Sequence, residues 1–361
     1  MTPHQPKREL CVFFTSADNP EIYAQKFAQG LTPNKLPYGL EFAPEGWKFT
    51  TASAMPGRRA TRLITSAFRF VFGVDVITAL RARKKLCASD FVYAHAEREY
   101  LGAALALILS RTKDTILVGQ TIWLFHDFDK QPWLHRVITR RLMRRMDALI
   151  YNAAPNYELG RELFPDKHHV LVPFGVSPRF EQPSTGSRSI VLSVGHDSAR
   201  DWPTLADALR ELPSSVPVRI ATAAELTLPA HVEVRATSSF AELLDLYRMA
   251  RVVVLALKPN SHASGVTTML EAAAAATPVI ATRAGGLDEY FTDDEVTFVA
   301  PGDSRALSLA IRDHLADPRQ EDVGLRLQDS FRKRGYDSAS YWGRITEVIE
   351  TLSTRRGRPL E

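Results

Sequence analysis

Short apolar runs that alternate with helical stretches along almost the whole chain are the feature that most restricts the fold. Continuous apolar strands separated by helices are typical of parallel sheets that helices cover on both faces. We therefore predict an α/β protein with two doubly wound, Rossmann-like domains. The predicted strands are residues 11–15, 91–94, 122–125, 148–151 and 169–173 in the first half, and 190–194, 218–222, 232–236, 252–257, 278–282 and 297–300 in the second.

The length of the chain also indicates two domains, because 361 residues exceed one typical core. Residues Pro173–Ser189 are rich in Pro, Gly and Ser and precede a strong new strand. We place the boundary in this segment, with residues 1–178 in the first domain and 179–339 in the second. Ligands of open α/β sheets bind beyond the carboxyl ends of the strands, so the two sheets are expected to face a central cleft.

The composition is that of an ordinary globular protein, with 45% apolar and 24% charged residues. The longest apolar run, Tyr100–Leu109, is too short to cross a bilayer, and the first ten residues lack the apolar core of a signal peptide. We expect a cytoplasmic protein. The two cysteines, Cys11 and Cys87, have no metal-ligand spacing and are interpreted as reduced structural thiols.

Positive charge is concentrated in the first half of the chain. Residues 1–178 carry 24 Lys and Arg against 16 Asp and Glu, whereas the whole chain has a net charge of only +4. The excess lies in Arg58–Lys85 and Arg136–Arg145, where cations mix with apolar residues. Such segments suit an anionic membrane surface or an anionic acceptor, although each alone is more often a solvated helix face. No nucleic-acid motif accompanies the charge, so nucleic acid is not expected as a partner.

The segment NSHASGVTTMLEAAAAATPVIATRAGG, residues 260–286, contains a candidate nucleotide site. The strand at 252–257 leads into a loop, and a helix is predicted from Val266 onward. Free N–H groups and the helix dipole at that start suit a phosphate. Glu271 lies about 9 Å further along the helix, where its carboxylate could accept both ribose hydroxyls; a solvated Glu is the alternative. The predicted donor-binding residues here are Ser264, Gly265, Val266, Thr267 and Glu271, with the Ala284-Gly286 loop nearby.

The order of these motifs resembles the GT-B glycosyltransferases of glycosyltransferase family 4. The resemblance rests on LSVG, the LEA helix, TPVIAT and GG in the second half. It extends to FVYAHAEREYLGAALAL and IWLFHDFD in the first half, to a linker that reads PFGV, and to the tail YDSASYWGRITEVIETL. Weak collinear matches thus run from Phe91 to Leu352. The family resemblance implies that the tail, at about 340–361, is a helix that packs back on the first domain.

The resemblance implies transfer of a sugar from a nucleoside diphosphate sugar to a hydroxyl, with retention of configuration and without a metal ion or other cofactor. The acceptor would be a polysaccharide, a lipid-linked saccharide or a small molecule, with possible attachment to the inner face of the membrane. Arg200 and Lys258 would neutralise the leaving diphosphate, and His126 would contact the sugar or the acceptor. The remaining expected contacts are Gly195 and His196 for the donor, and His95, Glu97 and Asp127 for the acceptor.

The sequence departs from the family pattern at one position that matters for chemistry. Members often carry two glutamates around the helix start; the second falls on Glu271, but the first falls on Ala263. His262 or the backbone of Ser264 could replace that carboxylate. A hydrolysing sugar-nucleotide epimerase and a noncatalytic nucleotide-sugar-binding subunit therefore stay open as alternatives. The Asp127-Phe128-Asp129 triplet could chelate a metal ion, but such triplets are frequent by chance.

Overall fold

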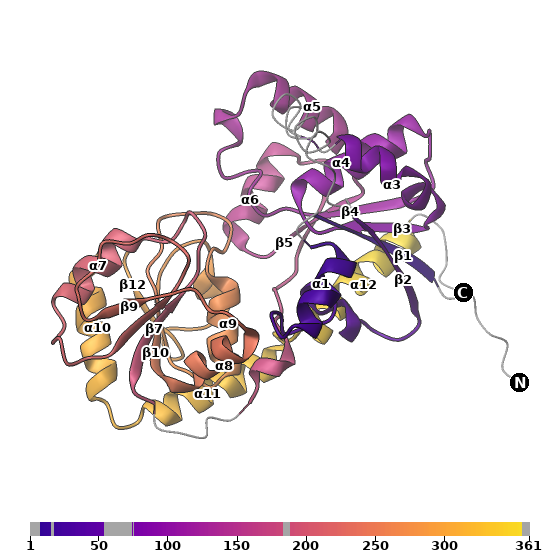
Figure 1. Cartoon of the computed structure of the whole chain (residues 1–361). Coiled ribbons are helices and arrows are strands. Elements are labelled where there is room, and N and C mark those ends of the chain that lie inside the picture. The colour runs from indigo at the N-terminus through magenta and orange to yellow at the C-terminus, as the bar shows by residue number, and fades with distance from the viewer. Residues whose placement is uncertain (1–7, 16–17, 54–73, 75, 183–187, 356–361) are drawn as a thin grey trace, which may run out of the picture.

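The computed structural model describes residues 8–15, 18–53, 74, 76–182 and 188–355, and it contains two six-stranded parallel sheets (Figure 1). The first has the order β2-β1-β3-β4-β5-β6 and the second the order β12-β11-β10-β7-β8-β9. The predicted α/β architecture with two doubly wound sheets is confirmed. The strands are β1 Arg8–Phe14, β2 Trp47–Ser53, β3 Phe91–Ala94, β4 Ile116–Gln120, β5 Ala148–Tyr151, β6 His168–Leu171, β7 Ile190–Val194, β8 Val218–Ala221, β9 Val232–Val234, β10 Ala250–Leu255, β11 Val279–Thr282 and β12 Thr297–Val299.

Helices cover both faces of the first sheet, as the apolar strands require. Side chains of α3 (Val76–Ala88), α4 (Glu97–Leu109) and α5 (Trp133–Met143) share a core with one face. The other face packs against α12 (Ser338–Arg355), whose Trp342 and Ile345 contribute to a second core. Figure 1 shows this last helix running from the second sheet back along the first. The first domain also contains α1 (Pro20–Ala28) and α6 (Ala154–Leu163).

The second sheet is enclosed in the same way. On one face α7 (Trp202–Arg210) and α10 (Ser304–Ala316) pack against β7, β8 and β10. On the other, α8 (Phe240–Met249), α9 (Val266–Ala274) and α11 (Gln320–Arg334) form the largest core. The small side chains of Ala272–Ala275 are fully buried there, which explains the alanine run as close packing of α9. Within the described ranges, no helix is both long enough and apolar enough to cross a bilayer.

One predicted strand is wrong. Residues 122–125 form turns, and the strand of this unit is β4, Ile116–Gln120. The backbone N–H groups of Ile122, Trp123 and Leu124 point to the carboxylate of Glu97 instead of a neighbouring strand. His126 therefore lies on a loop rather than directly after a strand. The structure also adds β2, a half-exposed edge strand within a part of the sequence where we predicted no element.

The chain passes between the two sheets twice, and the two crossings are hydrogen-bonded to each other. Val176 N donates to Tyr336 O at 2.9 Å, and Ser338 N donates to Val176 O at 2.9 Å. A Cβ on Gly175 would lie 2.3 Å from the carbonyl oxygen of Asp337, so a side chain is excluded at this point. The linker and the start of α12 therefore form one paired connection between the sheets.

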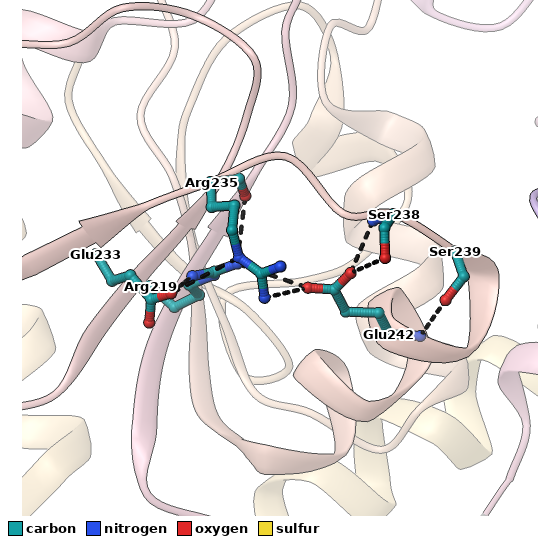
Figure 2. A network of polar contacts seen from close by, with 6 residues as sticks. All are labelled: Arg219, Glu233, Arg235, Ser238, Ser239 and Glu242. Atoms are coloured by element: carbon teal, nitrogen blue, oxygen red, sulfur yellow. Dashed lines mark hydrogen bonds and ion pairs between the residues drawn. The ribbon is translucent and has the colours of Figure 1, made fainter.

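A polar network fixes the start of α8, the helix that borders the candidate site (Figure 2). Arg219 of β8 is buried and contacts Glu233 of β9, while Arg235 donates to Glu242 of α8 at 2.6 Å. Ser239 caps the helix by accepting from Glu242 N, and the N–H and hydroxyl of Ser238 donate back to the Glu242 carboxylate. These hydrogen bonds keep the pKa of Glu242 below its usual value. The helix is thereby held against the edge strands.

Candidate donor site at the start of helix α9

The start of α9 has no side-chain cap. Gly265 is the N-cap residue, with φ of +84°, and no side chain bonds the first helical N–H groups. The preceding loop is shaped locally: Asn260 Oδ1 accepts from His262 N and Ser264 N, and Ala263 adopts a left-handed φ of +51°. Uncapped N–H groups at the positive end of a helix are suited to bind an anion. The predicted helix start is thus present; Val266 N donates to Ala263 O at 3.0 Å, so a ligand would use the N–H groups that follow it.

The guanidinium of Arg200 lies directly beside this helix start. Its side chain is only 4% exposed, and Nη2 donates to Thr268 Oγ1 of α9 at 3.1 Å. Nη1 points toward Gly265 and has no hydrogen-bond partner among the described residues. Burial lowers the pKa of Arg200 from its usual value, with Asp197 acting in the opposite direction. A buried cation with an unused donor beside free amides is a strong anion site.

Gly195 is required for this position of the guanidinium. It ends β7 with φ of +142°, and a Cβ there would lie 2.3 Å from Arg200 Nε. The absence of a side chain therefore lets the guanidinium lie across the strand end. The sequence placed Gly195 and Arg200 at the same sheet edge, and the structure brings them into contact.

Asp197 places a carboxylate in the same site, which the sequence analysis did not predict. Its Oδ2 is 3.3 Å from Arg200 Nε, and its Oδ1 accepts from Ser264 Oγ at 2.8 Å. Ser264 directly follows Ala263, the position where the family resemblance expects a glutamate. A carboxylate thus contacts this loop, but it comes from the β7–α7 loop.

Glu271 faces the inside of the site from the second turn of α9. Its Oε2 accepts from the hydroxyl of Tyr247, a fully buried residue of α8, at 2.7 Å. Burial raises the pKa of Glu271 to about 7, while Tyr247 and Arg200 act to lower it. One carboxylate oxygen is therefore held by α8, and the carboxylate has an unusually high affinity for a proton at neutral pH.

Three other predicted donor-binding residues are exposed. Lys258 is exposed, and its Nζ donates to Ser198 O at 3.3 Å, so its ammonium group is bound to the loop backbone. His196 is exposed at the end of β7, next to Asp197. Thr267 is also exposed, on the outer side of the first turn of α9.

The first domain reaches this site through the loop after β4. Trp123 packs its ring on His262 with centroids 3.8 Å apart, and His126 Nδ1 is 3.1 Å from Ser261 Oγ. Burial lowers the pKa of His262 to about 4, so its ring is neutral at pH 7. Neither ring nitrogen of His262 has a hydrogen-bond partner in the described part of the chain. His126 thus lies beside the loop that precedes α9, although it is on a loop and not at the end of a strand.

The predicted acceptor residues have different surroundings. Glu97 Oε1 accepts from three consecutive N–H groups of the loop 122–124, so the carboxylate shapes the loop that carries Trp123 and His126. His95 is buried and stacks on Tyr38 with centroids 3.4 Å apart; burial lowers its pKa to about 3. Asp127 is exposed and pairs with Lys130 at 2.7 Å.

The Asp triplet is divided between two ion pairs. Asp127 pairs with Lys130, and Asp129 Oδ1 is 4.0 Å from Arg136 Nη1. Among the residues that the structure describes, no three His, Cys, Asp or Glu side chains are grouped in a way that could hold a metal ion.

Residues 219–337 match the family model described as glycosyl transferases group 1. The matched segment runs from β8 to the residue that precedes α12. No curated protein sequence gives a significant match.

Solved glycosyltransferase structures share the whole fold at low identity. Sucrose-phosphate synthase from Thermosynechococcus elongatus aligns with a TM-score of 0.72 and 15% identity over 96% of this chain and 100% of its own. Anabaena HepE in complex with UDP-glucose aligns with a TM-score of 0.68 and 14% identity over 95% and 99% of the two chains. The alpha,alpha-trehalose 6-phosphate synthase from Burkholderia multivorans aligns with a TM-score of 0.65 and 13% identity over 97% of this chain and 98% of its own. The protein therefore has the GT-B fold.

The matched segment contains the α9 start and Glu271, whereas Gly195, Asp197 and Arg200 precede it in the chain. The candidate site thus includes a strand end outside the matched segment. Sequence analysis missed Tyr247, Thr268 and Trp123, because each acts through a contact distant in sequence. Thr268 had a usable signal, since it lies one helical turn before Glu271 and so faces the same side of the helix.

Proposed function

We propose that this glycosyltransferase moves a sugar from a nucleoside diphosphate sugar to a hydroxyl acceptor. One observation supports this most directly: the buried Arg200 guanidinium has an unused Nη1 donor directed at the uncapped start of α9. A diphosphate placed between them would receive N–H donors from both sides. Charge that develops on the leaving diphosphate would be stabilised by groups already in position.

The same placement of the diphosphate determines which residues the nucleoside would contact. With the diphosphate at the α9 start, the ribose would reach Glu271, whose carboxylate would accept its hydroxyls. Tyr247 would act as a positioning residue, because it holds one carboxylate oxygen at 2.7 Å. Solved HepE contains UDP-glucose, which makes a uridine donor the first to test here.

The reacting sugar would lie between α9 and the loop 121–132. His126 is on the opposite side of the site from Arg200, where it could contact the sugar or the acceptor hydroxyl. We propose that transfer retains the anomeric configuration and needs no metal ion, since Arg200 and the amides supply the positive charge; the resemblance in sequence supports retention. Nuclear magnetic resonance of the product anomer tests this part.

The test of the donor site is a thermal-shift panel of UDP, GDP, ADP, dTDP and their glucose conjugates. A diphosphate present at a hundred times its dissociation constant should add about 2.7 kcal/mol to the free energy of unfolding. Arg200→Met should weaken that ligand by at least about tenfold, since it removes a charged hydrogen-bond donor. Asp197→Asn should tighten binding about three- to tenfold, because a competing anion 3.3 Å from Arg200 is neutralised.

Arg188→Met provides the matched control. Arg188 is an arginine of the same domain, but it lies at the opposite sheet edge, where it donates to Tyr247 O, Ala250 O and Ala275 O. This variant should lose stability without a change in the ligand-induced shift. A flat response to every nucleotide, or equal shifts in the Arg200 and Arg188 variants, would contradict the proposed site.

Turnover separates transfer from the two alternatives. Release of the diphosphate that depends on an added hydroxyl acceptor supports transfer. Release with an isomerised sugar and no acceptor would indicate an epimerase, and tight binding with no turnover of any donor would indicate a noncatalytic subunit.

A further inference from the structure

The outward side of α5 carries exposed apolar and basic side chains that share one helix face. At 100° per residue, Trp133, Val137, Arg140, Arg141 and Arg144 fall on the same side. Trp133 is 69% exposed and Val137 is 54% exposed. The opposite side of the helix, with Leu142 and Met143, is buried in the core. We call the first set, Trp133, Val137, Arg140, Arg141 and Arg144, the α5 face.

The charge of the α5 face is poorly compensated. Neither Arg141 nor Arg144 has an ion pair within the described ranges of the chain. Arg140 lies over the ring of Phe128 at 5.8 Å, which leaves its charge at the surface. Arg136, at the edge of the face, lies 4.0 Å from Asp129. A cluster of arginines with this little compensation attracts anions.

A hollow adjoins the C-terminal end of the α5 face. It has a volume of about 430 Å³ and is lined by the end of α4 and the residues that follow α5, including Ile108, Arg111, Lys113 and Arg144. Arg145 donates to the carbonyl groups of Thr112 and Thr115 and pairs with Asp147 at 3.2 Å, so the loop that carries Lys113 is held in place. The hollow thus combines several cations and the carboxylate of Asp147, which is paired with Arg145, with the apolar side chains of Leu107 and Ile108.

We propose that the α5 face and this hollow form a docking surface for an anionic lipid bilayer. Trp133 and Val137 would enter the interfacial region, where an indole ring is favoured, and Arg140, Arg141 and Arg144 would contact lipid phosphates. The hollow would receive one headgroup between Arg111, Lys113 and Arg144. Charge complementarity and the exposed tryptophan together favour a bilayer over a soluble anion, because a soluble anion gives no reason to expose Trp133. This docking goes beyond sugar transfer and does not depend on it.

The basic segment at 58–85 does not contribute to this inference, because most of it lies outside the described residues. Its described part, in α3, uses some cations internally: Arg83 donates to Ser110, and Lys85 donates to the carbonyl of Thr51.

The experiment is cosedimentation of the full chain with sucrose-loaded vesicles, without any donor present. Vesicles of phosphatidylcholine alone are compared with vesicles that contain phosphatidylglycerol. We expect binding to the anionic vesicles only, and weaker binding at high salt. Arg141→Glu/Arg144→Glu should weaken binding by at least about tenfold, and Trp133→Ser should weaken it severalfold.

Matched controls come from the second domain. Arg305→Glu/Arg326→Glu changes the net charge by the same amount at exposed positions, and Leu325→Ser removes an apolar residue that is 57% exposed. Both should bind like the parent chain. The melting temperature and the nucleotide-induced shift should be unchanged in every variant, which keeps loss of docking distinct from failure of the donor site.

Several results would overturn the proposal. No binding to anionic vesicles at low salt would do so, as would equal loss in the α5 and control variants. Tighter binding to a single-stranded DNA oligonucleotide than to vesicles, with no effect of Trp133→Ser, would show a general polyanion site instead.

Discussion

The environment of Glu271 predicts a pH dependence that can be measured in solution. Burial raises its pKa to about 7, so the carboxylate is only half ionised at neutral pH. If the ionised form accepts the ribose hydroxyls, affinity for a nucleoside diphosphate sugar should increase about tenfold from pH 6 to pH 8. Both phosphates of such a donor are diesters and stay ionised over this range, so calorimetric titration would report the protein group. Glu271→Gln should bind weakly and without pH dependence.

The Glu271 carboxyl also affects the free energy of unfolding, but this contribution decreases as pH rises, whereas the donor affinity increases. A raised pKa means that the folded state holds the proton more tightly than the unfolded chain. The stabilising contribution is therefore complete below the usual value of 4.5 and is lost as pH rises through about 7. Affinity and stability should thus diverge over this window in the parent chain. Parallel changes, or a donor affinity independent of pH, would show that the Glu271 carboxylate does not bind the ribose.

The sequence predicted part of this site at the residue scale. Gly195, Arg200, Gly265 and Glu271 were recognisable because strand ends and helix starts attract anionic ligands for local reasons. Asp197 was not, since its contact with Ser264 joins loops that are 67 residues apart. The sequence around a carboxylate does not show whether its side chain will point into a binding site or into solvent.

At the element scale, one carboxylate binds three consecutive N–H groups of the loop 121–132. Glu97 binds the N–H groups of Ile122, Trp123 and Leu124, and so determines the position of Trp123 and His126 against α9. Glu97→Ala should lower the free energy of unfolding by about 1–3 kcal/mol, because three backbone donors lose a charged acceptor. Turnover should fall while diphosphate affinity stays the same, since the α9 site is untouched. Denaturant unfolding and steady-state kinetics would measure the two effects.

Glu158→Ala is the control for this prediction. Glu158 is an exposed acid of α6 that pairs loosely with Arg161 at 3.6 Å. It should change neither stability nor turnover measurably. A Glu97 variant with unchanged turnover would mean that the loop keeps its position without the carboxylate, or that Trp123 and His126 have no part in the reaction.

This loop also shows where prediction of the elements failed. The letters IWLF have the composition of a strand, whereas ILVGQ, the real strand, is interrupted by glycine. Composition alone could not show that the N–H groups of the first segment would bind a side chain. The edge strand Trp47–Ser53 was missed for a related reason, because half-exposed polar positions remove the apolar signal. The other buried strands were predicted well, since both of their faces are covered.

Over the whole molecule, the last helix is part of the first domain although the chain reaches it through the second. Trp342 is fully buried in the core with β1 and β3, and its Nε1 donates to Tyr38 O at 3.0 Å. Tyr341 of the same helix bonds the hydroxyl of Tyr93 at 2.9 Å. The first sheet therefore lacks one of its covering layers until the whole chain has been made.

The Trp342→Ala variant tests whether the stability of the first domain depends on α12. Removal of a buried tryptophan should cost about 3–5 kcal/mol, and the loss should fall on the first domain. Calorimetry with a saturating nucleoside diphosphate should then show two transitions. The ligand raises the melting temperature of the second domain, and the substitution should lower only that of the first domain. Phe331→Ala, a fully buried change in α11 of the second domain, should move the other transition instead. An equal downward shift of both transitions in each variant would mean that the paired crossings at Val176 and Ser338 couple the two domains into one cooperative unit.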